Sequence, residues 1–254
     1  MLGEALTDEL VVSDCTFGYS RTSVLENFSV GFAAGATVLL GPNGAGKSTL
    51  LGLLASIYRP QHGSVELLGV GRSSDRRTIR RYRKAVAWLP QHAGIFAGLT
   101  VREHVAYAGW LKGMRRRDAW SRAADALRTM DLQDFESRSA TKLSGGQARR
   151  MQLAGALVHE ARVVLLDEPT AGLDPLQQAR FGDLIKSLPD HIVTIVATHD
   201  VNDLSDSFDR VVVIDGGILR FEDTVDNFTS TAPSGVEPHR RSLVAYSQIV
   251  KSEG

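Results

Sequence analysis

The chain has 254 residues, enough to bury a sizeable core, with 29 basic and 29 acidic side chains and a formal net charge of zero. This balance argues against a general nucleic-acid binder, which is usually basic, so we expect no nucleic-acid partner. Cys15 is the only cysteine, which rules out an intrachain disulfide and is typical of a reducing compartment.

The apolar residues are distributed in a way that bears on membrane targeting. Residues 1–10 contain acids and no long apolar run, so we predict no signal peptide. No stretch of the sequence approaches the roughly 18 apolar residues that span a bilayer. Any role at a membrane would therefore depend on a partner.

Segments typical of strands and of helices alternate along most of the chain, which predicts an α/β fold. Two or three strands are expected in residues 10–32. A buried strand at 36–40 leads into a glycine-rich loop and then a helix at about 47–57. The next strands are expected at 64–68 and 85–89.

The pattern changes after the strand at 85–89. Residues 91–140 look helical throughout, with apolar side chains at helical spacing, and we expect an inserted helical lobe there. Strands and helices then alternate again. We expect strands at 162–166, 192–198, 210–215 and 218–221, and a helix at 175–188 that begins with a proline.

These patterns suggest a division of the chain into one main domain and a tail. The main domain is predicted to cover residues 1–229, with the helical lobe inserted at about 92–160. Residues 230–254 contain Pro233, Gly235 and Pro238, and we expect a loose C-terminal tail that could hold a short helix near 243–250.

The loop after the strand at 36–40 fits G-x-x-x-x-G-K-[ST] without deviation. Its glycines let backbone N–H groups surround phosphate oxygens, and the following helix points its positive end at the same anion. Lys47 is expected to reach the β- and γ-phosphates, Ser48 to supply a hydroxyl to Mg²⁺, and Thr49 to add a phosphate contact. The predicted nucleoside triphosphate site comprises Gly41, Pro42, Asn43, Gly44, Ala45, Gly46, Lys47, Ser48 and Thr49.

A second set of functional residues follows the apolar strand at 162–166. A strand this apolar is typical of a sheet buried on both faces, and ligands bind at the carboxyl ends of strands in such sheets. Asp167 is expected to hold Mg²⁺, directly or through water. Glu168 is expected to orient and deprotonate an attacking water. Together with the phosphate loop, these acids predict a nucleoside triphosphatase.

The segment Leu143-Ser144-Gly145-Gly146-Gln147 narrows this prediction. It matches the LSGGQ signature at every position and opens a predicted helix at 147–158. With it, residues 10–225 resemble the ABC (ATP-binding cassette) ATPase family. The resemblance implies a P-loop NTPase cassette with a RecA-like core, an N-terminal antiparallel β subdomain, an inserted helical subdomain, and an active site that hydrolyses ATP with Mg²⁺.

The resemblance also implies roles for four residues outside these motifs. Tyr19 is similar to the aromatic residue that stacks on adenine, although a strand tyrosine packed on its sheet would look the same. Gln91 is similar to the glutamine that senses Mg²⁺ and the attacking water, although it could be an ordinary loop residue. His199 resembles the switch histidine, which contacts the γ-phosphate and positions Glu168.

The fourth residue belongs to a mechanism that requires two cassettes. Asp174, in Ala171-Gly172-Leu173-Asp174, resembles a residue that reaches across a dimer. In the family, each ATP lies between the phosphate loop of one cassette and the signature of another. Ser144, Gly145 and Gly146, with Gln147, would meet the γ-phosphate held by the partner. The resemblance thus implies a second cassette as partner, identical or not.

The sequence gives only weaker indications of the process that ATP hydrolysis by this chain would power. Residues 94–104 resemble the matching segment in ABC-2-type drug and antibiotic exporter subunits. The implied function is the ATPase subunit of a transporter, with export as the expected direction, bound to a transmembrane permease on the cytoplasmic face of the membrane. Phe96, Leu99 and Tyr107 could form the docking surface for that permease, or equally the core of the helical lobe.

Two further alternatives stay open. The basic stretch 72–84 and the run 115–117 could be solvated faces, or could contact anionic lipid headgroups. The chain could also be a soluble ABC ATPase that drives assembly, repair or translation. Against this second function, the chain has one cassette and no heptad-rich insert.

Overall fold

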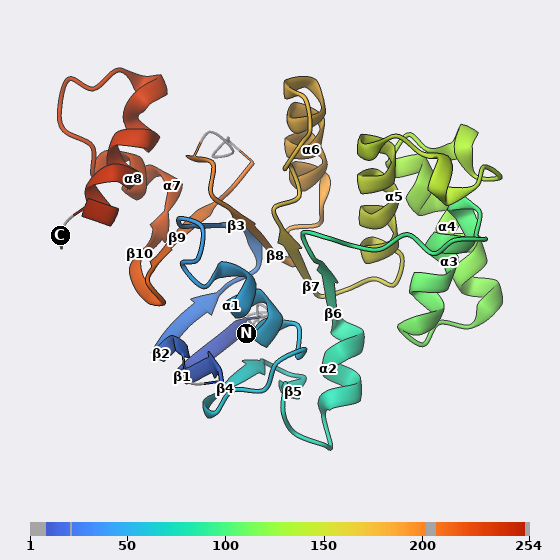
Figure 1. The fold of residues 1–254 in the computed structure, drawn as a ribbon, viewed down its shortest axis with the longest axis horizontal. Coiled ribbons are helices and arrows are strands. Elements are labelled where there is room, and N and C mark those ends of the chain that lie inside the picture. The colour runs from blue at the N-terminus through green and yellow to red at the C-terminus, as the bar shows by residue number, and fades with distance from the viewer. Residues whose placement is uncertain (1–8, 21, 202–206, 252–254) are drawn as a thin grey trace, which may run out of the picture.

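The computed structural model describes residues 9–20, 22–201 and 207–251. Most of the N-terminal segment in which no signal peptide was predicted, residues 1–8, lies outside the described residues. Two β-sheets and the helices that surround them make up the described part (Figure 1). No helix within these ranges is long and apolar enough to cross a bilayer.

The larger sheet has six strands in the order β10-β9-β3-β8-β7-β6 within the described residues. All neighbours pair in parallel except β9 and β10, which form an antiparallel hairpin. The bounds are β3 (Gly35–Leu40), β6 (Val86–Leu89), β7 (Val163–Asp167), β8 (Val193–Thr198), β9 (Arg210–Asp215) and β10 (Ile218–Thr224).

The smaller sheet is antiparallel, with the order β2-β1-β4-β5. Cys15 is fully buried in this sheet, where its thiol donates to the Ser64 carbonyl oxygen at 3.3 Å. Burial raises the pKa of this thiol. The bounds are β1 (Leu10–Tyr19), β2 (Thr22–Phe32), β4 (His62–Leu67) and β5 (Gly71–Arg72).

The helices fall into groups that Figure 1 shows clearly. Helices α3, α4 and α5 form a lobe at one end of the molecule, and α7 and α8 lie at the other end, next to β10. The bounds are α1 (Lys47–Leu54), α2 (Ile79–Ala85), α3 (Val101–Leu111), α4 (Arg116–Thr129), α5 (Gly145–Leu157), α6 (Pro175–Ser187), α7 (Val225–Ser230) and α8 (Arg241–Lys251), with short 3-10 turns η1 (Gln133–Phe135), η2 (Ala140–Lys142) and η4 (Pro238–Arg240).

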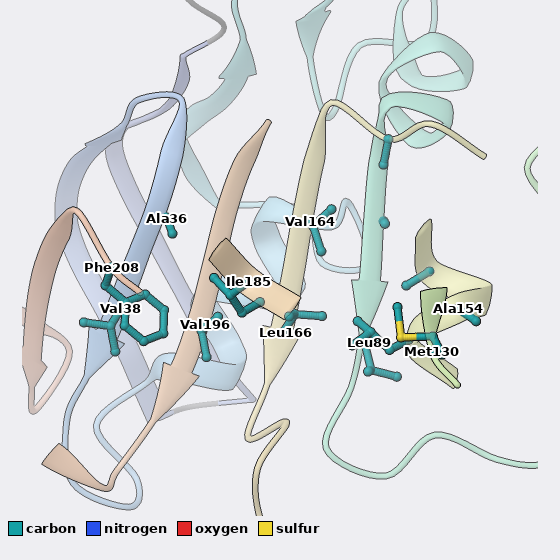
Figure 2. Close-up of a cluster of buried hydrophobic side chains, with 14 of the residues drawn as sticks. Ala36, Val38, Leu89, Met130, Ala154, Val164, Leu166, Ile185, Val196 and Phe208 are labelled. Atoms are coloured by element: carbon teal, nitrogen blue, oxygen red, sulfur yellow. The ribbon is translucent and has the colours of Figure 1, made fainter. Parts of the chain in front are cut away.

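Both faces of the larger sheet are buried, as the apolar strand at 162–166 predicted. Leu165 and its neighbours of like orientation pack against α1 and the smaller sheet. On the other face, Leu166 and Val196 pack against Ile185 of α6, and Figure 2 shows this cluster reaching Met130 of the helical lobe. Successive side chains of a strand point to opposite faces of the sheet, so a strand covered on both faces is apolar at most of its positions.

Two sequence expectations are wrong in part. Residues 91–140 are not helical throughout, because 91–100 form a non-helical connection before α3. That connection holds Gly94 and Gly98, and Gly98 adopts a φ of +85°, which lies outside the helical region. Helix α1 also ends three residues early, since Ser56 turns to a left-handed φ of +58°.

The C-terminal segment is more ordered than the sequence predicted. The short helix expected near 243–250 is present as α8, which covers residues 241–251. The tail is not loose, because Ala245 of this helix is fully buried in the main core. Phe228 of α7 is also fully buried and contacts the Phe221 ring at a centroid distance of 5.5 Å. Pro233, Gly235 and Pro238, on which the expectation of a loose tail was based, lie in the connection before α8. They separate α7 from α8 but do not prevent α8 from forming.

Candidate functional site

The glycine-rich loop joins β3 to α1 at the carboxyl end of the larger sheet. Gly46 is the N-cap of α1 and has a φ of +105°, a conformation that side chains rarely adopt. A Cβ on Gly41 would lie only 2.2 Å from the Ile214 carbonyl oxygen. The loop therefore needs these two glycines to bring its backbone close around an anion at the helix N-terminus.

Lys47 lies inside this loop and is almost fully buried. Its Nζ donates to the carbonyl oxygens of Gly41 at 2.7 Å and Pro42 at 3.1 Å. Burial lowers the pKa of Lys47, while the carboxylates of Glu168 and Asp167 oppose that shift. The loop carbonyls thus hold an ammonium group where it can pair with an anion.

Asp167 ends β7 with a carboxyl group that is nearly inaccessible to solvent. Its Oδ1 is buried and has no hydrogen-bond partner among the described residues. Burial raises the pKa of Asp167, and a hydrogen bond with the Ser48 side chain lowers it. A buried polar atom without a partner is unusual and needs an explanation.

A divalent cation would supply that missing partner. The described residues contain no group of three or more His, Cys, Asp or Glu side chains placed to hold a metal. Mg²⁺ does not require such a group, because it is commonly bound through one or two carboxylates together with substrate phosphates and water. The pair of Ser48 and Asp167 fits Mg²⁺ that arrives with a nucleotide.

Glu168 is the residue at which the structure gathers other predicted site residues. His199 Nδ1 lies 2.9 Å from its Oε1 and 3.0 Å from its Oε2. Lys47 Nζ lies 3.9 Å from Oε1. Glu168 is buried and adopts a φ of +47°, a conformation that costs energy and recurs at functional sites. The backbone is thus strained at the carboxylate that faces the loop.

Tyr19 belongs to an aromatic group on the edge of this site. Its ring is 47% exposed and contacts Phe17 and Tyr58 edge-on, with centroid distances of 5.2 Å and 5.7 Å. Its hydroxyl lies 3.3 Å from Thr49 Oγ1, so the ring stands beside the start of α1. An exposed ring in that position can accept a flat base. Tyr58 completes the group, and no sequence motif had singled it out.

The Ser144 segment caps the N-terminus of α5. Ser144 Oγ accepts from the Gln147 backbone N–H at 3.3 Å, and the Gln147 side chain accepts from the Ser144 N–H at 3.0 Å. This capping box leaves α5 with a regular N-terminus that faces outward. Figure 1 places α5 in the helical lobe, on the other side of β8 and β7 from α1. The structure therefore does not unite the signature and the phosphate loop of one chain.

Two further predicted residues lie on connections between these parts. Asp174 is the N-cap of α6, and its Oδ1 accepts from the Gln177 N–H at 2.9 Å. Gln91 follows β6 with an exposed side chain, and its carbonyl oxygen lies 3.5 Å from Arg149 Nη1. A Cβ on Gly146 would lie 2.3 Å from Gln177 Oε1, so α5 and α6 approach closely beside the signature.

The helical lobe carries exposed aromatic rings. Phe96 and Trp110 are 52% and 53% exposed, and Tyr107 lies between them with ring-centroid distances of 5.3 Å and 5.7 Å. Leu99 is half-buried. Phe96 and Tyr107 therefore lie on the surface of the lobe and not in its core. Of the two alternatives that the sequence left open for these residues, a docking surface or the core of the lobe, the exposed rings favour the surface.

A basic groove is lined by residues of α2 and of the segments where α1 and α3 end. It has a volume of about 810 Å³ and contains five basic side chains and no acidic one among its lining residues. Lys112 is one of these lining residues, and its Nζ donates to the carbonyl oxygens of Arg83 at 3.0 Å and Val86 at 2.7 Å. The lining residues are Ala55, Ser56, Ile57, Arg80, Arg81, Arg83, Lys84, Leu111, Lys112 and Gly113.

Comparison with known proteins gives a consistent result. The family model described as ABC transporter matches residues 25–171. The chain is 34% identical over 220 residues to the daunorubicin/doxorubicin resistance ATP-binding protein DrrA of Streptomyces peucetius, covering 86% of this chain and 66% of that protein. It is 33% identical over 215 residues to the sulfate/thiosulfate import ATP-binding protein CysA of Mycobacterium tuberculosis, covering 84% and 60%. This chain thus spans less than two thirds of the length of either relative.

A solved structure supports the same conclusion for the fold. The cbiO1 protein from Clostridium perfringens, part of the ABC transporter complex cbiONQ, superposes with a TM-score of 0.78 at 27% sequence identity. The match covers 87% of this chain and 90% of that one. The α/β fold predicted from the sequence, a P-loop cassette with an added helical lobe, is confirmed.

Proposed function

Because this chain belongs to the ABC transporter family, we propose that it binds and hydrolyses ATP as the ATPase subunit of a membrane transporter. The observation that carries the proposal is the cluster around the phosphate loop. There Lys47 and His199 both approach the carboxylate of Glu168, and a buried oxygen of Asp167 lacks a partner. These are the groups that phosphoryl transfer to water requires.

Each of these residues has a role in the proposed reaction. The loop amides and Lys47 hold the β- and γ-phosphates, and Ser48 with Asp167 holds Mg²⁺, aided by Gln91. Mg²⁺ supplies charge neutralisation between the phosphate oxygens. Glu168 orients the attacking water and accepts its proton, and His199 keeps the Glu168 carboxylate in place and contacts the γ-phosphate. Tyr19 stacks on the adenine ring.

A second cassette completes the site. Since the signature of this chain lies in the lobe, away from its own phosphate loop, it is free to contact nucleotide held by another copy or by a related cassette. The capped N-terminus of α5 presents Ser144, Gly145 and Gly146 to that γ-phosphate, with Gln147 fixing the cap. Asp174 stands beside this surface at the start of α6.

A transmembrane subunit is the second proposed partner. The exposed rings of Phe96, Tyr107 and Trp110 give it an apolar docking surface. The basic groove offers exposed side chains such as Arg80 and Arg81 to its acidic residues. Through this partner, the chain is proposed to lie on the cytoplasmic face of the membrane. Export is the proposed direction, supported by residues 94–104 and by the resistance protein DrrA, although the importer relative is about equally similar.

The proposed domain organisation is the one expected from the sequence. Residues 1–229 form the ATPase domain, with the helical subdomain inserted at about 92–160. Residues 230–254 form a short C-terminal segment, of which α8 packs on the sheet and α7. The helical subdomain carries the signature and the docking surface, so movement of this lobe can connect the nucleotide to the membrane partner.

Substitution of Glu168 by Gln tests the proposed reaction. We expect Glu168→Gln to lower ATP hydrolysis at least about 100-fold, because the amide cannot accept the proton from water. ATP binding should persist, and the variant should form a dimer in ATP and Mg²⁺ that size-exclusion chromatography detects. Wild-type protein that binds no Mg-ATP, or a variant that hydrolyses ATP at the wild-type rate, would contradict the proposal.

A further inference from the structure

Arg149 lies on α5, two residues after the signature, and its guanidinium makes five hydrogen bonds. A guanidinium has five N–H donors, so its whole donor capacity is used. Every acceptor is a main-chain carbonyl oxygen. The distances are 2.9 Å to Asp167, 3.2 Å to Glu168, 3.2 Å to Pro169, 3.1 Å to Pro90 and 3.5 Å to Gln91.

These carbonyls belong to two segments that are far apart in the sequence. One is the end of β7, which carries Asp167 and Glu168, and the other is the connection after β6, which carries Gln91. Arg149 itself belongs to the helical lobe. One side chain therefore joins the signature helix to the main chain that carries Glu168 and to the Gln91 segment, through a planar group with fixed donor directions.

The hydrogen bonds also act where the backbone is strained. Glu168 adopts a φ of +47°, which a non-glycine residue keeps only if its surroundings enforce it. Arg149 Nη2 bonds the carbonyl oxygens of both Asp167 and Glu168, so it fixes the peptide planes on either side of the strained residue. The Glu168 N–H is fixed separately, by the Ala197 carbonyl oxygen at 2.9 Å.

We propose that Arg149 is a positioning residue that sets Glu168 and the Gln91 segment relative to the signature helix. When the signature engages the nucleotide of the partner cassette, a shift of α5 is passed through Arg149 to the Glu168 of the same chain. The two composite sites are thereby coupled. This inference rests on the proposed function, since it assumes ATP hydrolysis by a dimer.

The neighbouring arginine provides a matched control. Arg150 lies on the same helix turn, but its Nη1 donates to the Met130 carbonyl oxygen at 2.9 Å, within the helical lobe. Arg150→Ala removes the same number of atoms from the same helix without touching the carboxylate segment. Arg149→Lys keeps the charge but offers three donors from a single point, so it can replace only part of the network.

Steady-state kinetics give the first test. We expect Arg149→Ala to lower kcat by about 100-fold, as misplacement of a catalytic group by about 1 Å can do. The KM for ATP should stay within about twofold, because Arg149 does not touch the nucleotide loop. The kcat of Arg149→Lys should lie between those of wild type and Arg149→Ala. The kcat of Arg150→Ala should resemble that of wild type. The Hill coefficient for ATP should fall in both Arg149 variants and remain in Arg150→Ala.

Hydrogen exchange in the nucleotide-free protein gives a readout that does not depend on turnover. Peptides that contain residues 167–169 and 90–91 should exchange faster in the Arg149 variants than in Arg150→Ala, at unchanged melting temperature for Arg149→Lys. Equal exchange and equal kcat in Arg149→Lys, Arg149→Ala and Arg150→Ala would overturn the inference. A loss of kcat that merely follows a lowered melting temperature would overturn it too. Failure of wild type to hydrolyse or bind Mg-ATP would instead refute the proposed function.

Discussion

At the scale of single residues, His159 is a half-buried histidine outside the candidate site. Both of its ring nitrogens are buried and have no hydrogen-bond partner among the described residues. Burial and the nearby ammonium of Lys112 lower its pKa to about 4. An unfolded histidine takes up a proton near its ordinary pKa of 6.5, whereas the folded chain resists protonation until about pH 4.

This difference predicts an acid-sensitive stability. Because the unfolded state binds the proton first, the free energy of unfolding falls as the pH drops from about 6.5 to about 4, by at most about 3 kcal/mol. His159→Gln should flatten that dependence, measured by urea unfolding across the pH range. His191→Gln, at an exposed histidine, should leave the dependence as in wild type. Parallel curves for both variants and wild type would contradict the prediction.

Lys47 supports a second residue-scale prediction. Lys47→Ala should weaken ATP binding by about 10- to 100-fold, since it removes charged hydrogen bonds to the phosphates. Hydrolysis should disappear mainly through that loss of binding. Titration of a fluorescent ATP analogue measures the affinity, and wild-type turnover in this variant would refute the assignment of the phosphate loop.

At the scale of elements, α3 illustrates how local sequence starts a helix after an irregular connection. Thr100 is its N-cap, with Oγ1 accepting from the Glu103 N–H at 3.2 Å, and Glu103 Oε2 accepts from the Thr100 N–H at 2.8 Å. We expect Thr100→Ala to lower the unfolding free energy by about 1 kcal/mol, measured by chemical denaturation. Arg115→Ala, at the N-cap of α4 where no side-chain cap forms, should change it less. Equal losses would contradict this account.

The elements that the sequence predicted are those with a strong periodic pattern. The strands at 162–166 and 192–198 are mostly apolar and match β7 and β8 closely. Helix α2 was not predicted, because Arg and Lys fill most of its seven residues and only Tyr82 is buried. Residues 91–100 were expected to be helical, yet their glycines favour a connection.

The candidate site was predictable where its residues follow motifs, and not where side chains meet across the fold. The phosphate loop and the acids that end β7 could be read from sequence, since a strand end fixes where such residues lie. Arg149 carried no comparable signal, because its acceptors are main-chain carbonyls of two distant segments. Every residue has a main-chain carbonyl oxygen, so the residue types in the sequence do not indicate which carbonyls accept these hydrogen bonds.

At the scale of the whole molecule, the basic groove predicts electrostatic docking of the membrane partner. Arg80→Glu combined with Arg81→Glu should reduce co-purification of a polytopic membrane protein with the tagged chain from detergent extract, and raised salt should act in the same direction. The ATPase activity of the isolated chain should not change. Arg116→Glu with Arg117→Glu, exposed on α4 outside the groove, is the control. Equal capture by both double variants would refute groove docking.

Cys15 makes the native chain suitable for site-specific labelling. The only thiol is fully buried in β1, donates to a carbonyl oxygen and has a raised pKa, so reagents that attack exposed thiolates should leave it unmodified. Pairs of cysteines introduced at exposed positions could then carry fluorophores or spin labels without removal of the native one. Trp110 on the lobe and Leu176 on α6 are two such positions, both more than half exposed. The proposed movement of the lobe could thus be recorded as a distance during turnover in otherwise native protein.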